Sequence, residues 1–407
     1  MANTLKFGNG EWYGKKDTIL AFNDENNNFK PLPFNFTRNS SATRVNKEGL
    51  IEVVSNNEPR IDFKDSSEGA LLLEPQRTNH FQQSNQFDTT WILSNVSVLG
   101  NQNGVGGSTD AWKLNANSGV GEKKIYVSGS SGIQTISVYA KKGTRDYLWL
   151  RGVTGGFNKR VFFNLSNGTI GNDEAISSKI IDINNGWYRC SAVFNQDGGY
   201  EFQIGVAEND NTVYYTDDGT GNIYIQNAQL EQGSYATSYI PTSGGVVTRS
   251  AEECFNLPPT GIIGQTELTI FYQGIVERLG GSDGHALALS QSADASGSSR
   301  ILLYRNSGNG NMYVYVQDST TQFSTPLLAN SNPQINDKYA IAIKDNDLVI
   351  YCNGVKVSEN TVGSLPSTQY IYLNKWNNLI NQQNIIKDFK IYNTRLSNEE
   401  LQQLTKI

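Results

Sequence analysis

Aromatic and polar side chains in loops offer the clearest chemistry in this sequence. An exposed indole can stack on the apolar face of a sugar ring, and Trp376 lies in the polar run 374–378. Tyr304 and Arg305 could serve in the same way, and His285 lies in a glycine-rich segment where it could contact a ligand. We therefore take Trp376, Tyr304, Arg305 and His285 as candidate carbohydrate-binding residues. Ordinary sandwich packing, or a solvated loop position for His285, is the alternative.

The sequence contains no recognisable catalytic set. Its two histidines join no serine and aspartate in a known pattern, and nucleophile-elbow, zinc-protease and phosphate-loop motifs are absent. A glycosidase needs two carboxylates about 5 to 9.5 Å apart across one bond. Asp345 and Asp347 instead fit a hairpin turn, and the adjacent Glu252 and Glu253 would point to opposite faces of a strand. We expect a protein that is not an enzyme.

Calcium is the one ion that the acidic residues suggest. Ca²⁺ prefers hard oxygen ligands, which loop carboxylates and backbone carbonyls supply. The candidate donors are Asp88, Glu231 and Asp283. Their spacing is not diagnostic, so a solvated carboxylate is the alternative for each. We expect no other cofactor.

Arginines recur through the first 78 residues, at Arg38, Arg44, Arg60 and Arg77. Guanidinium groups bind carboxylates through paired hydrogen bonds, within a chain or between chains. A segment with so little apolar periodicity is not expected to fold alone. We interpret the four arginines as assembly residues that dock the segment on a neighbouring subunit. The alternative is an intramolecular brace for the first sandwich, using carboxylates such as Asp62 and Glu74.

Composition limits the classes of partner. The chain has 407 residues and a net charge of −6, and its basic residues are scattered, so we expect no nucleic-acid partner. No run of about 18 apolar residues is present, so we expect no membrane span. The N-terminus lacks the apolar run of a signal peptide, and we expect synthesis in a cytoplasm. The three cysteines are far apart, which favours buried free thiols.

Short alternating segments bounded by Gly, Asn or Asp run through most of the chain. Two examples are residues 133–140 and 147–151, and the 39 glycines and 37 phenylalanines and tyrosines suit strands joined by tight turns. Only Ser397–Leu404, with a capping-box pattern, predicts a helix. We predict an all-β fold: an irregular N-terminal attachment region (1–78) followed by two antiparallel β-sandwich domains of jelly-roll type (79–250 and 251–407).

The C-terminal region carries a specific pattern. Residues 338–357 form a predicted hairpin pair whose second turn is Asn353-Gly354, and the segment 386–401 follows, with the sequence IKDFKIYNTRLSNEEL. This order resembles the concanavalin-like, laminin-G-type sandwich. The resemblance implies the fold and leaves the activity open, because that fold hosts lectins, glycanases and adhesion modules.

The middle region resembles jelly-roll carbohydrate-binding modules found in phage tail proteins. The segment 186–191, GWYRCS, matches one of their strands, and 223–233, IYIQNAQLEQG, matches their last strand. The resemblance implies a sandwich that can bind sugar.

The N-terminal region resembles the head of tailed-bacteriophage tail and fibre proteins. The match runs in order through FTRNSSATRV at 36–45, NEPRIDF at 57–63 and GALLLEPQRTN at 69–79. It departs from the family at Asn39 and His80, where Ala and Leu are usual. The resemblance implies a virion protein made in the host bacterial cytoplasm, with other virion proteins as partners and a homotrimeric state.

We therefore expect a structural tail-fibre or head-fibre protein that binds host cell-surface carbohydrate without cleaving it. One alternative is a purely structural decoration of the capsid or tail without a ligand. Another is a polysaccharide depolymerase, which would need the carboxylate pair that the sequence does not show.

Overall fold

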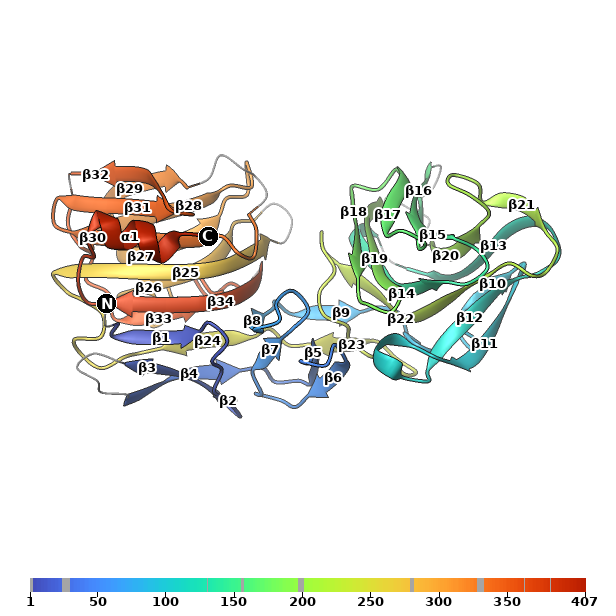
Figure 1. Cartoon of the computed structure of the whole chain (residues 1–407), viewed down its shortest axis with the longest axis horizontal. Coiled ribbons are helices and arrows are strands. Elements are labelled where there is room, and N and C mark those ends of the chain that lie inside the picture. The colour runs from blue at the N-terminus through green and yellow to red at the C-terminus, as the bar shows by residue number, and fades with distance from the viewer. Residues whose placement is uncertain are drawn as a thin grey trace. The chain divides into compact units, whose positions relative to one another are not determined.

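A computed structural model of the chain describes residues 3–23, 30–129, 131–154, 157–196, 201–278, 282–327, 333–361, 363–380 and 382–407. The chain divides into two compact units (Figure 1). Unit 1 contains Met1–Lys47, Val53–Gln76 and Ser250–Ile407. Unit 2 contains Glu48–Glu52 and Arg77–Arg249. Both are built of antiparallel strands, so the predicted all-β fold with sandwich domains is confirmed.

The units divide the chain differently from the three predicted regions. Ser250 begins the last segment of unit 1, next to the predicted boundary after residue 250. Residues 1–47 and 53–76, however, belong to the same unit as the C-terminal region and contribute strands to its sheet.

Unit 1 contains most of the strands and the α-helix. Its N-terminal strands are β1 (Leu5–Gly8), β2 (Gly14–Lys15), β3 (Thr18–Asn23), β4 (Lys30–Thr37), β5 (Ala42–Val45), β7 (Arg60–Asp62) and β8 (Ala70–Leu73), and β6 (Ile51–Val54) crosses the unit boundary. Its other elements are β24 (Glu253–Asn256), β25 (Glu267–Arg278), β26 (Gly284–Ser290), β27 (Ser299–Arg305), β28 (Met312–Asp318), β29 (Thr320–Pro326), β30 (Lys338–Lys344), β31 (Asp347–Cys352), β32 (Val355–Asn360), β33 (Tyr370–Leu373), β34 (Gln382–Tyr392) and α1 (Asn398–Thr405).

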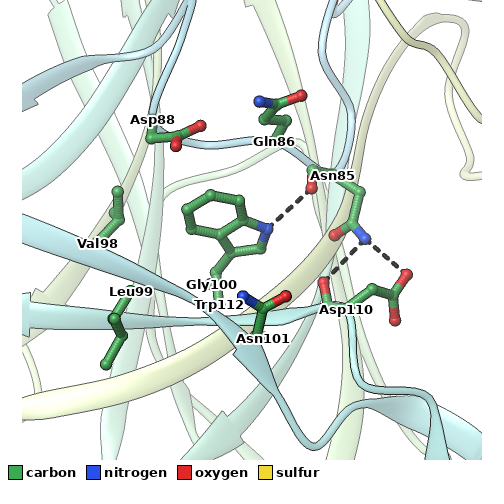
Figure 2. A pocket seen from close by; sticks show the side chains of 9 residues that line it. All are labelled: Asn85, Gln86, Asp88, Val98, Leu99, Gly100, Asn101, Asp110 and Trp112. Carbon is green, nitrogen blue, oxygen red and sulfur yellow. Dashed lines mark hydrogen bonds between the residues drawn. The ribbon is translucent and has the colours of Figure 1, made fainter.

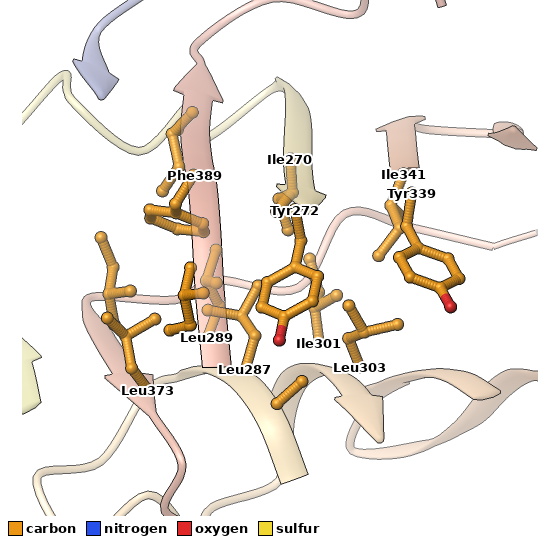
Figure 3. Packing of buried hydrophobic residues seen from close by; sticks show 14 of the residues in the cluster. Ile270, Tyr272, Leu287, Leu289, Ile301, Leu303, Tyr339, Ile341, Leu373 and Phe389 are labelled. Atoms are coloured by element: carbon orange, nitrogen blue, oxygen red, sulfur yellow. The ribbon is translucent and has the colours of Figure 1, made fainter. Parts of the chain in front are cut away.

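The N-terminal strands join two halves of the unit 1 sheet. One half runs β29-β28-β27-β26-β33-β24, and the other runs β32-β31-β30-β25-β34. Strand β4 pairs with β24, β3 pairs with β4 and β1, and β1 pairs with β34, where Leu5 lies opposite Ile391. The alternating apolar residues of both halves face one core, in which Tyr272 and Phe389 pack beside Leu287 and Leu303 (Figure 3).

A buried ionic cluster fixes the N-terminal segment within unit 1. Arg38, Arg60, Glu74 and Glu252 have fully buried side chains. Arg38 Nη1 donates to Glu252 Oε1 at 2.7 Å, Arg60 Nε donates to the same oxygen at 2.8 Å, and Arg60 also pairs with Glu74 at 2.8 Å. Two charges of each sign therefore neutralise one another where water is excluded, which is the condition under which a buried charge is tolerated.

Helix α1 and its turns follow the sequence pattern. The Ser397 side chain accepts from the Glu400 backbone while Glu400 reaches back to Ser397, so the predicted capping box is confirmed. Leu401 packs with Phe271 and Tyr351 against the sheet. Asn353 and Gly354 both have positive φ, as the predicted hairpin turn requires. Among the described residues no helix is long and apolar enough to cross a membrane.

Unit 2 is a sandwich of two sheets around its own apolar core. One sheet runs β10-β13-β20-β15-β16-β17 with β21 paired to β13, and the other runs β11-β12-β22-β14-β19-β18. The elements are β9 (Arg77–Asn79), β10 (Ile92–Ser94), β11 (Val96–Gln102), a 3₁₀ turn (Val105–Gly107), β12 (Ala111–Ala116), β13 (Gly119–Ser128), β14 (Gly132–Lys142), β15 (Tyr147–Thr154), β16 (Phe157–Asn164), β17 (Thr169–Asp173), β18 (Ser177–Asp182), β19 (Trp187–Gln196), β20 (Glu201–Ala207), β21 (Tyr214–Asp217), β22 (Asn222–Gln232) and β23 (Val247–Arg249).

Candidate functional site

Unit 2 has an open groove of about 450 Å³ beside strands β11 and β12 (Figure 2). A ligand pocket is typically about 300 to 1,000 Å³, so the groove can hold part of an oligosaccharide. Its lining comes from the loop before β10, from β11 and from the start of β12: Asn85, Gln86, Asp88, Val98, Leu99, Gly100, Asn101, Asp110 and Trp112. We call it the Trp112 groove.

The indole of Trp112 lies at the centre of this groove (Figure 2). Its ring packs edge-on against Phe87, with centroids 6.1 Å apart, and Nε1 donates to the Asn85 carbonyl at 2.9 Å. A Cβ on Gly100 would lie 3.2 Å from Cη2 of the ring. Glycine at this position lets β11 pass close to the indole, which stays half-buried and open to the groove.

One wall of the groove is held rigidly. Asn85 Nδ2 donates to both the carbonyl and Oδ2 of Asp110, at 3.0 and 2.9 Å. Gln226 Nε2 donates to Asp110 Oδ1 at 2.7 Å, and the Asn227 backbone donates to Asn85 Oδ1 at 3.0 Å. Because strand β22 holds both side chains through Gln226 and Asn227, this wall needs little ordering when a ligand binds.

The other polar side chains of the groove are free for a ligand. Gln86, Asp88 and Asn101 are exposed, and within the described part of the chain their side chains make no hydrogen bond. A β-bulge between Leu99 and Gln102, with Asn101 at φ 58°, lies at this point of β11. Leu99, 56% exposed, adds an aliphatic surface. The groove thus combines an aromatic ring with unused hydrogen-bonding groups.

Three of the four predicted carbohydrate-binding residues meet elsewhere, on unit 1. Tyr313 stacks on Tyr304, Tyr304 on His285, and His285 lies beside Trp376, with successive ring centroids 5.6, 5.6 and 5.9 Å apart. The guanidinium of Arg300 lies 4.5 Å from the Trp376 ring centroid. We call these four rings the aromatic ladder; its members are half-buried.

The aromatic ladder is less suited to sugar stacking than the Trp112 groove. A sugar must reach the face of a ring, whereas the ladder rings and Arg300 already stack on one another. Burial lowers the pKa of His285 to about 4, so the imidazole is neutral near pH 7. The fourth predicted residue, Arg305, directly follows Tyr304 on β27 and pairs with Glu277 at 3.0 Å.

The three predicted calcium donors lie in different surroundings. Asp88 is exposed in the Trp112 groove, whereas Glu231 is fully buried, with its oxygens accepting from Gln229 and Thr237 at 2.5 to 2.7 Å. Asp283 belongs to unit 1 and accepts from the Ser307 backbone at 2.6 Å. Across the described ranges, no cluster of three or more His, Cys, Asp or Glu side chains could hold a metal ion.

The predicted assembly arginines have intramolecular partners. Arg38 and Arg60 are fully buried around Glu252, so their side chains offer no surface to another subunit. They brace the N-terminal segment within unit 1, and not the first sandwich that the alternative named. Arg77 is 5% exposed and lies 3.7 Å from Glu231. Arg44 is half-buried.

Sequence reasoning named Asp88 but missed the rest of the groove. Trp112 lies in a short alternating segment like several others in the chain, and nothing local shows which face of the strand is open. Asn85 and Asp110 are 25 positions apart, and their contact depends on the folded loop. The one local signal is the high frequency of Asn, Asp and Gln in residues 82–110, which indicates a polar surface.

Comparison with known proteins gives weak similarities. No protein-family model and no curated protein matches the chain. Among solved structures, the CBM40 module of the Ruminococcus gnavus IT-sialidase, bound to alpha2,3 sialyllactose, is 13% identical with a TM-score of 0.30, covering 36% of this chain and 84% of that one. The receptor-binding domain of a botulinum neurotoxin C/D mosaic serotype is 16% identical with a TM-score of 0.30, covering 38% and 40%. At these values the likeness does not bear on function.

Proposed function

We propose that the chain binds carbohydrate without cleaving it, and that the Trp112 groove is the binding site. The observation that carries this proposal is the half-buried indole of Trp112 ringed by Gln86, Asp88 and Asn101, whose hydrogen-bonding groups are unused. Sugar rings present an apolar face together with hydroxyl groups that donate and accept. An aromatic ring flanked by amides and a carboxylate matches both properties.

The carboxylates of the groove support binding rather than hydrolysis. A glycosidase acid needs a carboxyl group whose pKa is raised by an apolar site. Asp88 is exposed to solvent, and both oxygens of Asp110 accept hydrogen bonds from amides. Both residues are exposed, so neither carboxylate lies in the apolar site that a glycosidase acid requires, and we propose no bond cleavage here. Incubation with host polysaccharide and a reducing-end assay tests this point, since release of reducing ends would contradict it.

The setting of the protein is proposed from its first 79 residues. Their resemblance to tailed-phage tail and fibre proteins favours a virion appendage that meets the host surface, made in the bacterial cytoplasm and assembled with other virion proteins. If one groove binds sugar weakly, several copies of the protein on one particle would raise the overall avidity. Immunogold labelling of intact particles tests this location; labelling of host cell debris but not of particles would contradict it.

The binding proposal is tested by screening the full chain on a glycan array and measuring the hits by calorimetry. Gln86→Ala, Asp88→Ala and Asn101→Ala should each weaken binding about three- to tenfold, the usual value of one hydrogen bond. Gln82→Ala is the matched control, because Gln82 is an exposed glutamine of the same segment outside the groove.

Two outcomes would overturn the proposal. An array without hits, using the assembled protein, would favour the purely structural role. Loss of binding in Trp376→Ala, with the three groove variants binding like the parent chain, would move the site to the aromatic ladder.

A further inference from the structure

We infer that the Trp112 groove selects uncharged sugars and excludes acidic ones; this inference rests on the proposed function. The nine lining residues include two carboxylates, Asp88 and Asp110, and no lysine, arginine or histidine. Lys113, which lies opposite Leu99 in the β11–β12 register, is not among them. The lining itself therefore presents two negative charges and no cation to an acidic ligand.

The two carboxylates flank the position that a stacked sugar would take. In Figure 2, Asp88 and Asp110 lie on opposite sides of the Trp112 ring. A sugar resting on the indole would point its substituents toward Asp88 or toward Asp110. Turning the sugar over therefore does not move an anionic substituent away from both carboxylates. Repulsion between like charges at such short range is weakened by solvent but not abolished.

Hydrogen-bonding capacity points to the same class of ligand. An ionised carboxylate only accepts hydrogen bonds, so Asp88 needs a donor, which a sugar hydroxyl supplies and a sugar carboxylate does not. The free amides of Gln86 and Asn101 can donate or accept and thus fit hydroxyl groups in either role. The net charge of −6 over the whole chain also disfavours the approach of an anionic glycan.

The test compares a matched pair of glycans. A neutral hexose oligosaccharide that binds the full chain is compared, by calorimetry, with the derivative in which its terminal primary alcohol is oxidised to a carboxylate. At low ionic strength the acidic derivative should bind at least tenfold more weakly. This difference in affinity should become smaller when salt is added, because the electrostatic screening length falls from about 10 Å at 0.1 M to about 3 Å at 1 M.

Charge variants identify the source of the selectivity. Asp88→Asn keeps the shape of the side chain and removes its charge, so the difference in affinity between the neutral and the acidic glycan should become smaller. Asp88→Lys should make the acidic glycan bind more tightly than the neutral one. Glu11→Gln, an exposed position in unit 1, changes the net charge equally and should leave the preference unchanged.

The outcomes separate the two proposals. Equal or tighter binding of the acidic derivative by the parent chain would overturn the charge selectivity and leave carbohydrate binding intact. Unchanged selectivity in Asp88→Lys would also overturn it. Binding of neither glycan, with hits absent from the array, would remove the groove as a carbohydrate site and the selectivity with it.

Discussion

Arg60 and Glu252 form a fully buried ion pair between residues 192 positions apart in the chain. Arg60 lies in the N-terminal segment, and Glu252 directly precedes β24 of the C-terminal segment. The same carboxylate also binds Arg38 and accepts from the Glu74 backbone at 2.8 Å. Removing this one carboxylate would leave two buried guanidinium groups without the acidic partner that they share.

We expect Glu252→Gln to destabilise unit 1 by about 3 to 5 kcal/mol, the usual cost of breaking a buried ion pair from one side. Urea unfolding followed by circular dichroism measures this change. Glu359→Gln is the control, because Glu359 pairs with Lys356 on the surface with 59% of its side chain exposed. Its cost should stay below about 1 kcal/mol. Equal effects of the two variants would contradict the structural role of the buried cluster.

Much of the fold could be predicted from the sequence, because alternation with period 2 is a local property. Strands such as β14 and β30 have it, and the capping box at Ser397 is equally local. The N-terminal strands are different: β7 has three residues and β1 has four, too short for any periodicity. The partner strand of β1 is also hundreds of positions away, as Leu5 and Ile391 show. The sequence of the N-terminal segment therefore predicts irregular structure, although the segment completes the sheet of unit 1.

The candidate site was predictable only in part. Aromatic residues beside polar and glycine-rich segments can be picked from the sequence, and Tyr304, His285 and Trp376 do lie together, although they are half-buried and the first two lie on strands. Whether their ring faces are open depends on what stacks on them, and here the partners are Tyr313 and Arg300. Trp112 is open because the loop that contains Asn85, 27 positions upstream, leaves a groove beside it, which no local pattern records.

His285 should make the protein less stable in mild acid. Burial lowers its pKa from 6.5 to about 4, with Asp283 opposing the shift and Arg300 adding to it. Between these values the unfolded chain binds a proton that the folded chain does not, so stability falls as pH drops through this window, by at most about 1.4 kcal/mol per pH unit.

Thermal unfolding of the parent chain and of His285→Phe between pH 7 and pH 4 isolates this contribution. Phenylalanine keeps a ring in the aromatic ladder and cannot bind a proton. The variant should lose less stability than the parent chain over this range. If the stability of the two proteins fell equally with decreasing pH, His285 would not contribute to the loss of stability in acid.

Glu231 should act as a structural acceptor and not as a calcium ligand. Its oxygens already accept from the Gln229 amide and from the backbone and hydroxyl of Thr237. Glu231→Gln puts a donor where acceptors are needed, so we expect a loss of about 1 to 3 kcal/mol. The loss should be the same with calcium and with EDTA in differential scanning calorimetry. A melting temperature of the parent chain that falls when EDTA is added would contradict this reading.

Gly100 should control the position of the Trp112 ring. Its φ is not in the left-handed region, so alanine fits the backbone, but the new Cβ would lie 3.2 Å from Cη2 and 3.3 Å from Cζ2 of the indole. The ring must shift by a few tenths of an ångström, and stacking on a bound sugar depends on its place. We expect Gly100→Ala to weaken binding of the array-selected glycan by about tenfold, with a change in unfolding free energy below about 1.5 kcal/mol.

Gly245→Ala, where no atom lies within 4 Å of the added carbon, should change neither quantity. Because the two substitutions add the same methyl group, equal affinities for the glycan would show that the position of the indole does not govern binding.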